Sequence, residues 1–215
     1  MLHTLIDNKT EIKNSIIAAA QELIKTTSIE TITIADVADE MLIAQKIIYE
    51  FFPGKAQLIE AVIEKEIEDK KAALQKVRMN ATNSIEQVFL GWNSISDFFK
   101  SMNNETLSQL KKFYAQSFKM VTEFKNLFLY NYFKLNIDTG ITQEVYRHNI
   151  KTELLSRYLI EILQLPNISQ ENRYGSAEAE NQLMTYHLYG IATEKGIKLV
   201  RKYQNEFLAY TSSFQ

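Results

Sequence analysis

Cysteine is absent from the 215-residue chain, and glycine and proline are scarce, with six and two copies. Without cysteine the chain can form neither a disulfide nor a thiolate metal site, which fits a reducing cytoplasm. The scarcity of helix-breaking residues and of alternating β-branched runs predicts an all-α fold. Long hydrophobic runs are also missing, and the polar residues 1–13 do not resemble a signal peptide. We therefore expect a cytoplasmic protein that does not enter a membrane.

Positive charge is scarce in the N-terminal part. The whole chain has a net charge of −2, and residues 1–60 contain five lysines against nine acidic residues, a net charge of −4. Nucleic-acid-binding domains usually present a positive face, because neutralising phosphates supplies most of their non-specific affinity. Either the few lysines share one face, or any DNA binding is weak.

Motifs for catalysis are also lacking. His3, His148 and His187 are far apart and have no metal-ligand spacing. The chain has no glycine-rich phosphate loop, nucleophile elbow or HExxH motif. Acidic pairs such as Asp39-Glu40 are more simply explained as solvated charges. We expect no enzyme activity, no metal and no cofactor.

The spacing of apolar residues predicts long helices. Steps of three and four indicate helices over about 10–26, from 55 through 77, and over 152–165, the last ended by Pro166. Ser84 and Gln87 form a capping signature after a break at 80–84. The sequence Asp138-Thr139-Gly140 indicates a turn, and 167–176 a polar loop. A final helical segment from about 177 is interrupted near Gly190 and Gly196.

Residues 33–55 contain the most informative pattern. A short helix is predicted from Thr33, with Asp36 in the capping-box position, and it breaks at 41–43. A second helix restarts at Ala44 and runs toward Phe52, before Pro53-Gly54-Lys55 opens the next. Two short helices joined by a tight turn are how many proteins place a recognition helix in the DNA major groove.

The residues around this pattern resemble the TetR family of bacterial transcriptional regulators. The matching segments include Ala19-Ala20, Ile32-Thr33-Ile34, Val37-Ala38, Ile47-Ile48-Tyr49 and Gly54-Lys55, with weaker similarity at 140–150 and 189–196. The resemblance implies an all-α chain of about nine helices. A three-helix DNA-binding domain with the helix-turn-helix would occupy residues 1–54, and a larger ligand-binding and dimerisation domain 55–215.

The resemblance also implies DNA contacts at Thr33, Gln45, Lys46, Tyr49 and Lys55. Gln45 and Lys46 are the candidates for base edges, since glutamine pairs with adenine and lysine reaches guanine. Thr33, Tyr49 and Lys55 are candidates for phosphate contacts. Thr33 is equally explained as a helix cap and Lys55 as an ordinary surface lysine. Leu23, Val37, Ile48 and Phe52 are assigned to packing.

Several residues depart from the family pattern. Leu42 stands where the turn usually has glycine, and left-handed geometry would cost it about 1–2 kcal/mol. We therefore expect the turn to adopt another shape. Ala44 replaces the usual serine cap at a cost of roughly 1 kcal/mol. Lys46-Ile47 replaces a small Gly-Thr pair, and Phe51 and Glu50 are poor neighbours for phosphate. The operator is then unusual, or DNA binding has been lost.

Residues 89–133 are rich in aromatic side chains, with 12 of the chain's 24. An apolar small-molecule site lined by Trp92, Phe99, Phe113 and Phe128 is one interpretation. An ordinary large core is the other. Six lysines lie between residues 100 and 134, and they indicate either an anionic ligand or a solvated face.

The last helices are candidates for a dimer interface, because Gly190 and Gly196 would allow two helices to approach closely. The predicted interface residues are Leu155, Tyr158, Leu159, Ile162, Leu183, Tyr186, His187 and Gly190. By resemblance, the chain is a homodimeric repressor that leaves a palindromic operator when an apolar effector binds. The alternative is a degenerate TetR-like helical dimer that binds a small molecule or a protein without DNA.

Overall fold

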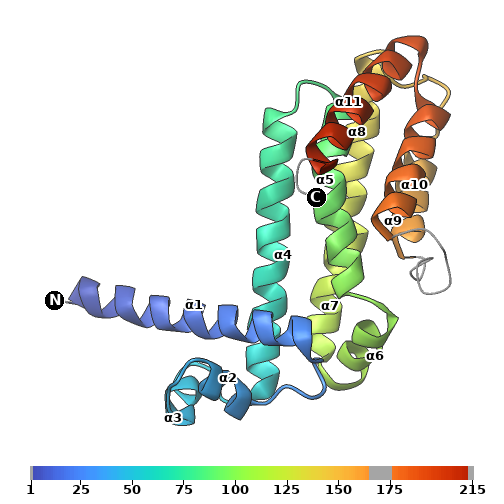
Figure 1. Cartoon of the computed structure of the whole chain (residues 1–215). Helices are drawn as coiled ribbons and strands as arrows, with labels where there is room; N and C mark the ends of the chain where they lie inside the picture. The colour runs from blue at the N-terminus through green and yellow to red at the C-terminus, as the bar shows by residue number, and fades with distance from the viewer. Residues whose placement is uncertain (1, 165–175, 213–215) are drawn as a thin grey trace. The chain divides into compact units, whose positions relative to one another are not determined.

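The computed structural model describes residues 2–164 and 176–212 (Figure 1). The described residues form α-helices and one π-helical segment, with no β-strand among them. The all-α prediction from the scarcity of glycine and proline is therefore confirmed. The predicted end at Pro166 and the polar loop lie mostly outside the described residues.

The chain divides into two compact units. Unit 1 comprises the chain up to Asp69 together with Asn104–Glu123, and unit 2 comprises Lys70–Asn103 and the chain from Phe124. Helix α4 (Lys55–Asn80) runs without a break from one unit into the other. The domain boundary predicted at residue 54 stays a prediction.

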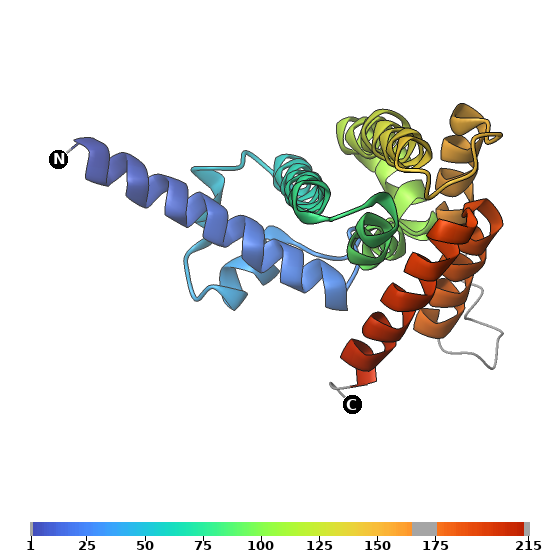
Figure 2. The same ribbon diagram turned by 90° about the horizontal axis from the view of Figure 1, so that it is seen from above.

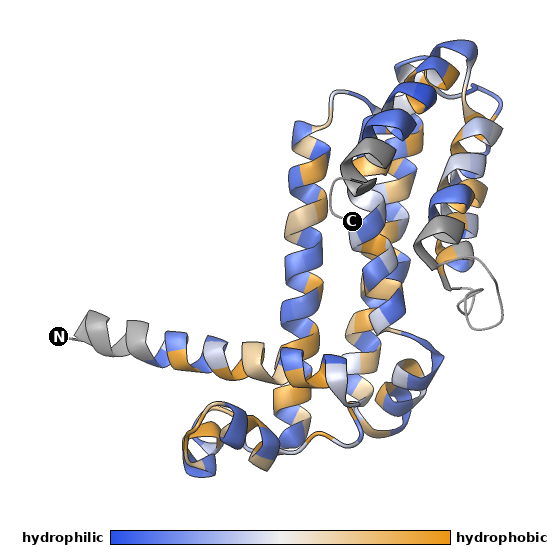
Figure 3. Cartoon of the chain, viewed as in Figure 1, coloured by the Kyte–Doolittle hydropathy of each residue, from blue (hydrophilic) through white to orange (hydrophobic). Residues whose placement is uncertain are grey.

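Unit 1 is built around three N-terminal helices and the start of α4. The helices are α1 (Leu2–Thr26), α2 (Ile34–Glu40) and α3 (Gln45–Tyr49), with α6 (Asn104–Phe113) and α7 (Ala115–Glu123) joining them. Helix α1 begins eight residues before the predicted start at Thr10. Its residues Ile16, Ile17 and Ala20 are buried, and Figure 3 shows hydrophobic residues along the side of α1 toward α2.

Helix α6 packs within unit 1 although it is distant in sequence from α1–α3. Leu110 is fully buried, and Gln109 Nε2 donates a hydrogen bond to Glu30 Oε2 at 3.3 Å. Sequence periodicity did not indicate this association, because it joins segments 79 residues apart.

Unit 2 is a helical bundle. It contains the end of α4, α5 (Ser84–Ser101), a π-helical segment (Phe124–Leu129), α8 (Tyr130–Thr142), α9 (Thr152–Gln164), α10 (Ser176–Ile191) and α11 (Glu194–Ser212). Helix α5 lies between α8 and α11 and packs against both (Figure 2). Its core residues include Phe89 and Trp92, which join a cluster with Met184, Leu188 and Val200.

Two predicted features of unit 2 were wrong. Asn83, not Ser84, caps α5, because the Asn83 side chain accepts hydrogen bonds from the amides of Ile85 and Glu86. The predicted turn at 138–140 lies inside α8. Its Gly140 is needed for packing, since an added Cβ would lie 2.1 Å from Cδ2 of the buried Tyr146 ring.

The connection after α8 is tied to the α10–α11 connection. Arg147 N donates to Ile191 O at 2.9 Å, and Thr193 N donates to Val145 O at 3.0 Å. Gly196 allows this approach, because a Cβ there would lie 2.1 Å from Val145 O. The predicted interruption of the last helical segment is thus a two-residue break between Ile191 and Glu194.

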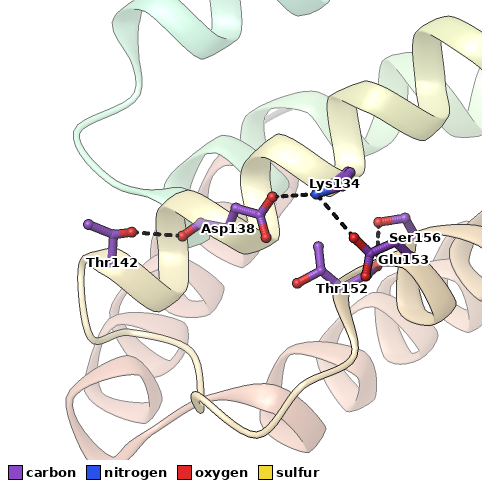
Figure 4. Close-up of polar contacts among 6 residues, drawn as sticks. All are labelled: Lys134, Asp138, Thr142, Thr152, Glu153 and Ser156. Carbon is purple, nitrogen blue, oxygen red and sulfur yellow. Dashed lines mark hydrogen bonds and ion pairs between the residues drawn. The ribbon is translucent and has the colours of Figure 1, made fainter.

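Polar contacts join the end of α8 to the start of α9 (Figure 4). Lys134 Nζ lies 2.9 Å from Asp138 Oδ2 on its own helix and 3.4 Å from Glu153 Oε1 on α9. The hydrogen bond from Lys134 holds the pKa of Asp138 below its ordinary value. Because these side chains remain partly in contact with water, the ion pairs add little to stability.

Candidate DNA-binding and effector sites

Helices α2 and α3 form the predicted helix-turn-helix. Residues 41–44 separate the two helices, as the sequence predicted. Ile34, Val37 and Ala38 of α2 and Ile48 of α3 are buried, as is Phe52 after α3. The packing role assigned to Val37, Ile48 and Phe52 is confirmed, whereas Leu23 is only partly buried.

The turn after α2 does not avoid left-handed geometry, so that expectation was wrong. Leu42 has φ 54° and a side chain that is 93% exposed. Leu42 N donates to Asp39 O at 3.1 Å, and Ile43 N donates to Ala38 O at 3.0 Å. These two bonds form the Schellman motif, which usually has glycine at this position. The two backbone hydrogen bonds hold the residue in a conformation that its side chain disfavours.

Ala44 occupies the N-cap position of α3. Its backbone is extended, with φ −73° and ψ 137°, and no side-chain hydrogen bond caps the helix. The predicted loss of the serine cap is confirmed. A short helix of five residues therefore begins without the hydrogen bond that usually stabilises such an end.

The three predicted contact residues of α3 all face outward. Gln45 and Lys46 are exposed, and Tyr49 is about half exposed. Glu50 is exposed directly after them and brings a negative charge to the same end of the helix.

Thr33 caps α2, as predicted, and is fully engaged with Asp36. Its Oγ1 accepts from Asp36 N at 3.1 Å and donates to Asp36 Oδ2 at 2.8 Å. Thr33 N donates to the same carboxylate oxygen at 2.7 Å. The start of α2 thus already holds an anion, the Asp36 carboxylate. A phosphate contact by Thr33 would have to displace or tolerate that charge.

Lys55 and Lys13 are also engaged inside unit 1. Lys55 Nζ donates to the backbone oxygen of Glu30 at 2.6 Å, and burial lowers the pKa of Lys55. Lys13 Nζ lies 5.8 Å from the centre of the Phe52 ring. Lys46, the lysine of the recognition helix, is exposed.

The predicted effector residues belong to two different units. Phe113 lies in unit 1 and is 52% exposed, whereas Trp92, Phe99 and Phe128 lie in unit 2. Phe99 and Phe128 belong to a chain of ring contacts, with centroid distances of 4.7–6.4 Å, through Phe98, Phe124, Tyr132 and Phe133. Trp92 belongs to the separate cluster of α5 with α10 and α11.

Buried polar atoms beside this ring chain were not found from the sequence. In the described part of the chain, Gln87 Nε2 and Tyr132 OH are buried and make no hydrogen bond. Burial raises the pKa of Tyr132, and the Gln87 side chain opposes part of that effect. Lys71 Nζ lies 5.9 Å from the Phe128 ring. No periodicity distinguishes such a glutamine or tyrosine from its neighbours, so the sequence carried no signal for them.

The predicted dimer residues are divided between core and surface. Leu159 is buried and Leu155 packs against the unit 2 core, whereas Tyr158 and Tyr186 are 55% and 67% exposed. Leu183 and His187 are partly buried, and the Ile162 side chain lies outside the described residues. Gly190 is exposed, and a Cβ added there would meet no atom within 4 Å. Leu154, another apolar residue of α9, is 66% exposed.

Neither a metal site nor a membrane segment is found among the described residues. No group of three histidine or acidic side chains there could hold a metal ion. No described helix is long and apolar enough to cross a membrane.

Two short helices joined by a tight turn, the second with exposed polar residues, define a class of fold, the helix-turn-helix domains. Residues 16–62 match the family model of bacterial regulatory proteins, tetR family. No curated protein is significantly similar in sequence. The chain therefore carries a tetR-family domain and has the fold of TetR-family transcriptional regulators.

Solved structures support this assignment of the fold across most of the chain. A transcriptional regulator from Cytophaga hutchinsonii is 18% identical, with a TM-score of 0.67 over 83% of this chain and 97% of its own. The ketosteroid transcriptional regulator KstR2 of Mycobacterium tuberculosis is 13% identical, with a TM-score of 0.59 over 85% and 95%. A gamma-butyrolactone receptor (ArpA-like protein) is 11% identical, with a TM-score of 0.64 over 93% and 99%. The names of these structural relatives describe transcriptional regulators and a receptor.

Proposed function

We propose that the chain is a sequence-specific DNA-binding transcriptional regulator, a homodimeric repressor that a small molecule releases from its operator. The observation that carries the proposal is the α2–turn–α3 arrangement. Ile48 anchors α3 in the core, and Gln45, Lys46 and Tyr49 project outward from it. A dimer would place two such helices about one DNA turn apart, roughly 34–36 Å.

Selection of bound sequences from a random DNA pool at low salt tests DNA reading. We expect a palindromic motif with half-sites about 10 bp apart. Lys46→Ala and Tyr49→Ala should each abolish enrichment of the motif. Lys76→Ala, which removes an exposed lysine of α4 in unit 2, is the matched control and should leave the motif unchanged.

Failure of the wild-type protein to enrich any motif, while it stays folded, would contradict this function. It would favour the second candidate, a helical dimer that acts without DNA. The Asp36 carboxylate at the start of α2 and the engagement of Lys55 with Glu30 are the observations in favour of that candidate.

The effector site is proposed in unit 2, along the ring chain from Phe99 to Phe128. The buried groups Gln87 Nε2 and Tyr132 OH could donate hydrogen bonds to an oxygen atom of an otherwise apolar ligand. The names of two structural relatives, a gamma-butyrolactone receptor and a ketosteroid regulator, describe molecules of that chemistry. We therefore place the effector among apolar molecules that carry carbonyl groups.

Thermal unfolding with a γ-butyrolactone, a ketosteroid and a long-chain fatty acid as probes tests the effector site. A probe that binds the folded state should raise the unfolding temperature. Phe128→Ala should remove the shift, and Leu127→Ala, an exposed neighbour in the same π-helical segment, should keep it. A shift that survives Phe128→Ala would place the ligand elsewhere.

The dimer is proposed to form through α9 and α10. Tyr158 and Tyr186 are large and exposed, and Gly190 leaves open space on the same helix as Tyr186. Tyr186→Arg should convert the dimer to a monomer in sedimentation measurements. Leu135→Arg, at an exposed site on α8, is the control and should not. A dimer that persists with arginine at both tyrosine positions would exclude this interface.

A further inference from the structure

We propose that Leu42 reads thymine methyl groups in the major groove. This inference rests on the proposed DNA-binding function and adds to it a base preference. The operator half-site would contain thymine where the turn between α2 and α3 meets the bases.

The position of Leu42 is set by the backbone rather than by its side chain. The hydrogen bonds from Leu42 N to Asp39 O and from Ile43 N to Ala38 O hold the turn in the left-handed conformation. The side chain is left 93% exposed. A bulky residue with positive φ is a true outlier, because its Cβ crowds the following carbonyl oxygen. Within the protein, almost no burial of the side chain offsets that strain.

The two exposed residues of the turn itself, Leu42 and Ala44, are apolar and have no side-chain donor for a phosphate. Ala44 is exposed two residues later and contributes only a methyl group. Gln45, the next residue, is exposed and can pair bidentately with adenine. In the major groove, an A·T pair presents the adenine edge and the thymine methyl side by side. An apolar side chain beside a glutamine thus matches A·T pairs better than G·C pairs.

The charge of the region favours base contacts over phosphate contacts. Asp39 and Glu40 are exposed just before the turn, and Glu50 is exposed after α3. These carboxylates repel phosphates, and Lys46 is the exposed cation of α3. Contacts to the bases must then supply a larger share of the affinity than in a basic helix-turn-helix protein.

Replacing thymine by deoxyuridine in the selected operator tests this inference, because it removes only the C5 methyl group. We expect symmetric replacement at one position of each half-site to weaken wild-type binding roughly 15-fold. Burying a methyl-sized group contributes about 0.8 kcal/mol, hence roughly fourfold in each half-site. Leu42→Gly should bind the thymine operator more weakly and make no distinction between the two DNAs.

Two further measurements keep the result interpretable. Leu42→Met, which keeps an apolar side chain of similar size, should keep the preference for thymine. The unfolding temperature of Leu42→Gly should be no lower than that of the wild type, so weaker binding would not reflect unfolding.

Equal wild-type binding of both operators at every thymine would overturn the inference, while a selected palindrome would leave the DNA-binding function intact. A preference for thymine that persists in Leu42→Gly would assign the methyl contact to another residue and also overturn it. If no DNA is selected at all, both the function and this inference fail.

Discussion

At the scale of single residues, the structure shows which departures from the family pattern are tolerated and which are compensated. Leu42 keeps the Schellman hydrogen bonds that glycine would make, at the cost of a left-handed backbone. Ala44 starts α3 without a cap. Both residues are in the turn of the helix-turn-helix, so the local stability of this turn is below what glycine and serine would provide.

Leu42→Gly should raise the free energy of unfolding by about 1 kcal/mol. Glycine adopts positive φ without the Cβ clash. The greater conformational entropy of glycine in the unfolded chain offsets part of this stabilisation. Urea denaturation measures the change. Leu42→Ala is the control, because it keeps a Cβ in the left-handed conformation, and it should not gain stability. An equal gain for both variants would contradict the strain argument.

Gly140→Ala should lower the free energy of unfolding by about 1–3 kcal/mol, which is the usual cost of overpacking a core. The new methyl would overlap the Tyr146 ring, whose Cδ2 and Cε2 atoms lie 2.1 and 2.4 Å from its position. The ring is fully buried and cannot move aside. Thermal unfolding measures the loss.

Gly190→Ala is the matched control, since its position is helical and open. In a monomer, Gly190→Ala should raise the free energy of unfolding by up to about 1 kcal/mol, because alanine has the higher helix propensity. A loss of dimer in the same variant would support close helix approach at Gly190.

At the scale of elements, a buried polar network connects α5, α8 and the loop after α8. Tyr146 OH lies 3.2 Å from both Ser84 O and Asn136 Oδ1, and Asn136 Nδ2 donates to Ser84 O at 2.9 Å. Burial raises the pKa of Tyr146 far above its ordinary value, so the phenol keeps its proton as a donor. The network determines how α5 and α8 meet.

His187 on α10 should make the stability of the protein fall as the pH falls. Burial lowers its pKa to about 4, from an ordinary value of 6.5. Above pH 6.5 the ring is neutral in both states, and below it the unfolded chain takes up the proton first. The free energy of unfolding should therefore drop between pH 6.5 and about 4, by about 1–2 kcal/mol at pH 5.

Urea denaturation at about pH 7 and pH 5 measures this effect of His187. His187→Gln should reduce the drop. His148→Gln, which removes an exposed histidine, should leave it unchanged. An identical drop in all three proteins would assign the pH dependence to other groups.

At the scale of the whole molecule, the question is how an acidic N-terminal segment would bind a polyanion. Residues 1–60 have a net charge of −4. Lys55 and Lys13, two of their five lysines, are engaged with Glu30 and the Phe52 ring. The segment therefore carries less positive charge than most DNA-binding domains present.

The affinity for the operator should depend only weakly on salt. The slope of log K against log salt concentration is about −0.9 for each phosphate neutralised. With Lys46 as the exposed lysine of α3, we expect a slope of magnitude about 4 or less for the dimer. Titrations between about 50 and 200 mM salt measure it. A slope of about −10 would show that other cationic side chains contact the DNA phosphates.

The sequence alone determined the helical class of the fold, the helix-turn-helix and the packing residues Val37, Ile48 and Phe52. These features depend on local periodicity, capping and the spacing of apolar residues, which are properties of neighbouring positions. The capping box of Thr33 and Asp36 and the missing cap at Ala44 were predicted for the same reason.

The tertiary structure alone decided the features that depend on residues distant along the chain. It placed α6 with the N-terminal helices, put Gly140 inside α8 against Tyr146, and assigned Phe113 to unit 1 but Phe99 and Phe128 to unit 2. It also left Leu42 in a left-handed turn, because two backbone hydrogen bonds outweigh the preference of one side chain. Buried donors such as Gln87 and Tyr132 become recognisable only when their surroundings are known, since burial is a property of the packed molecule.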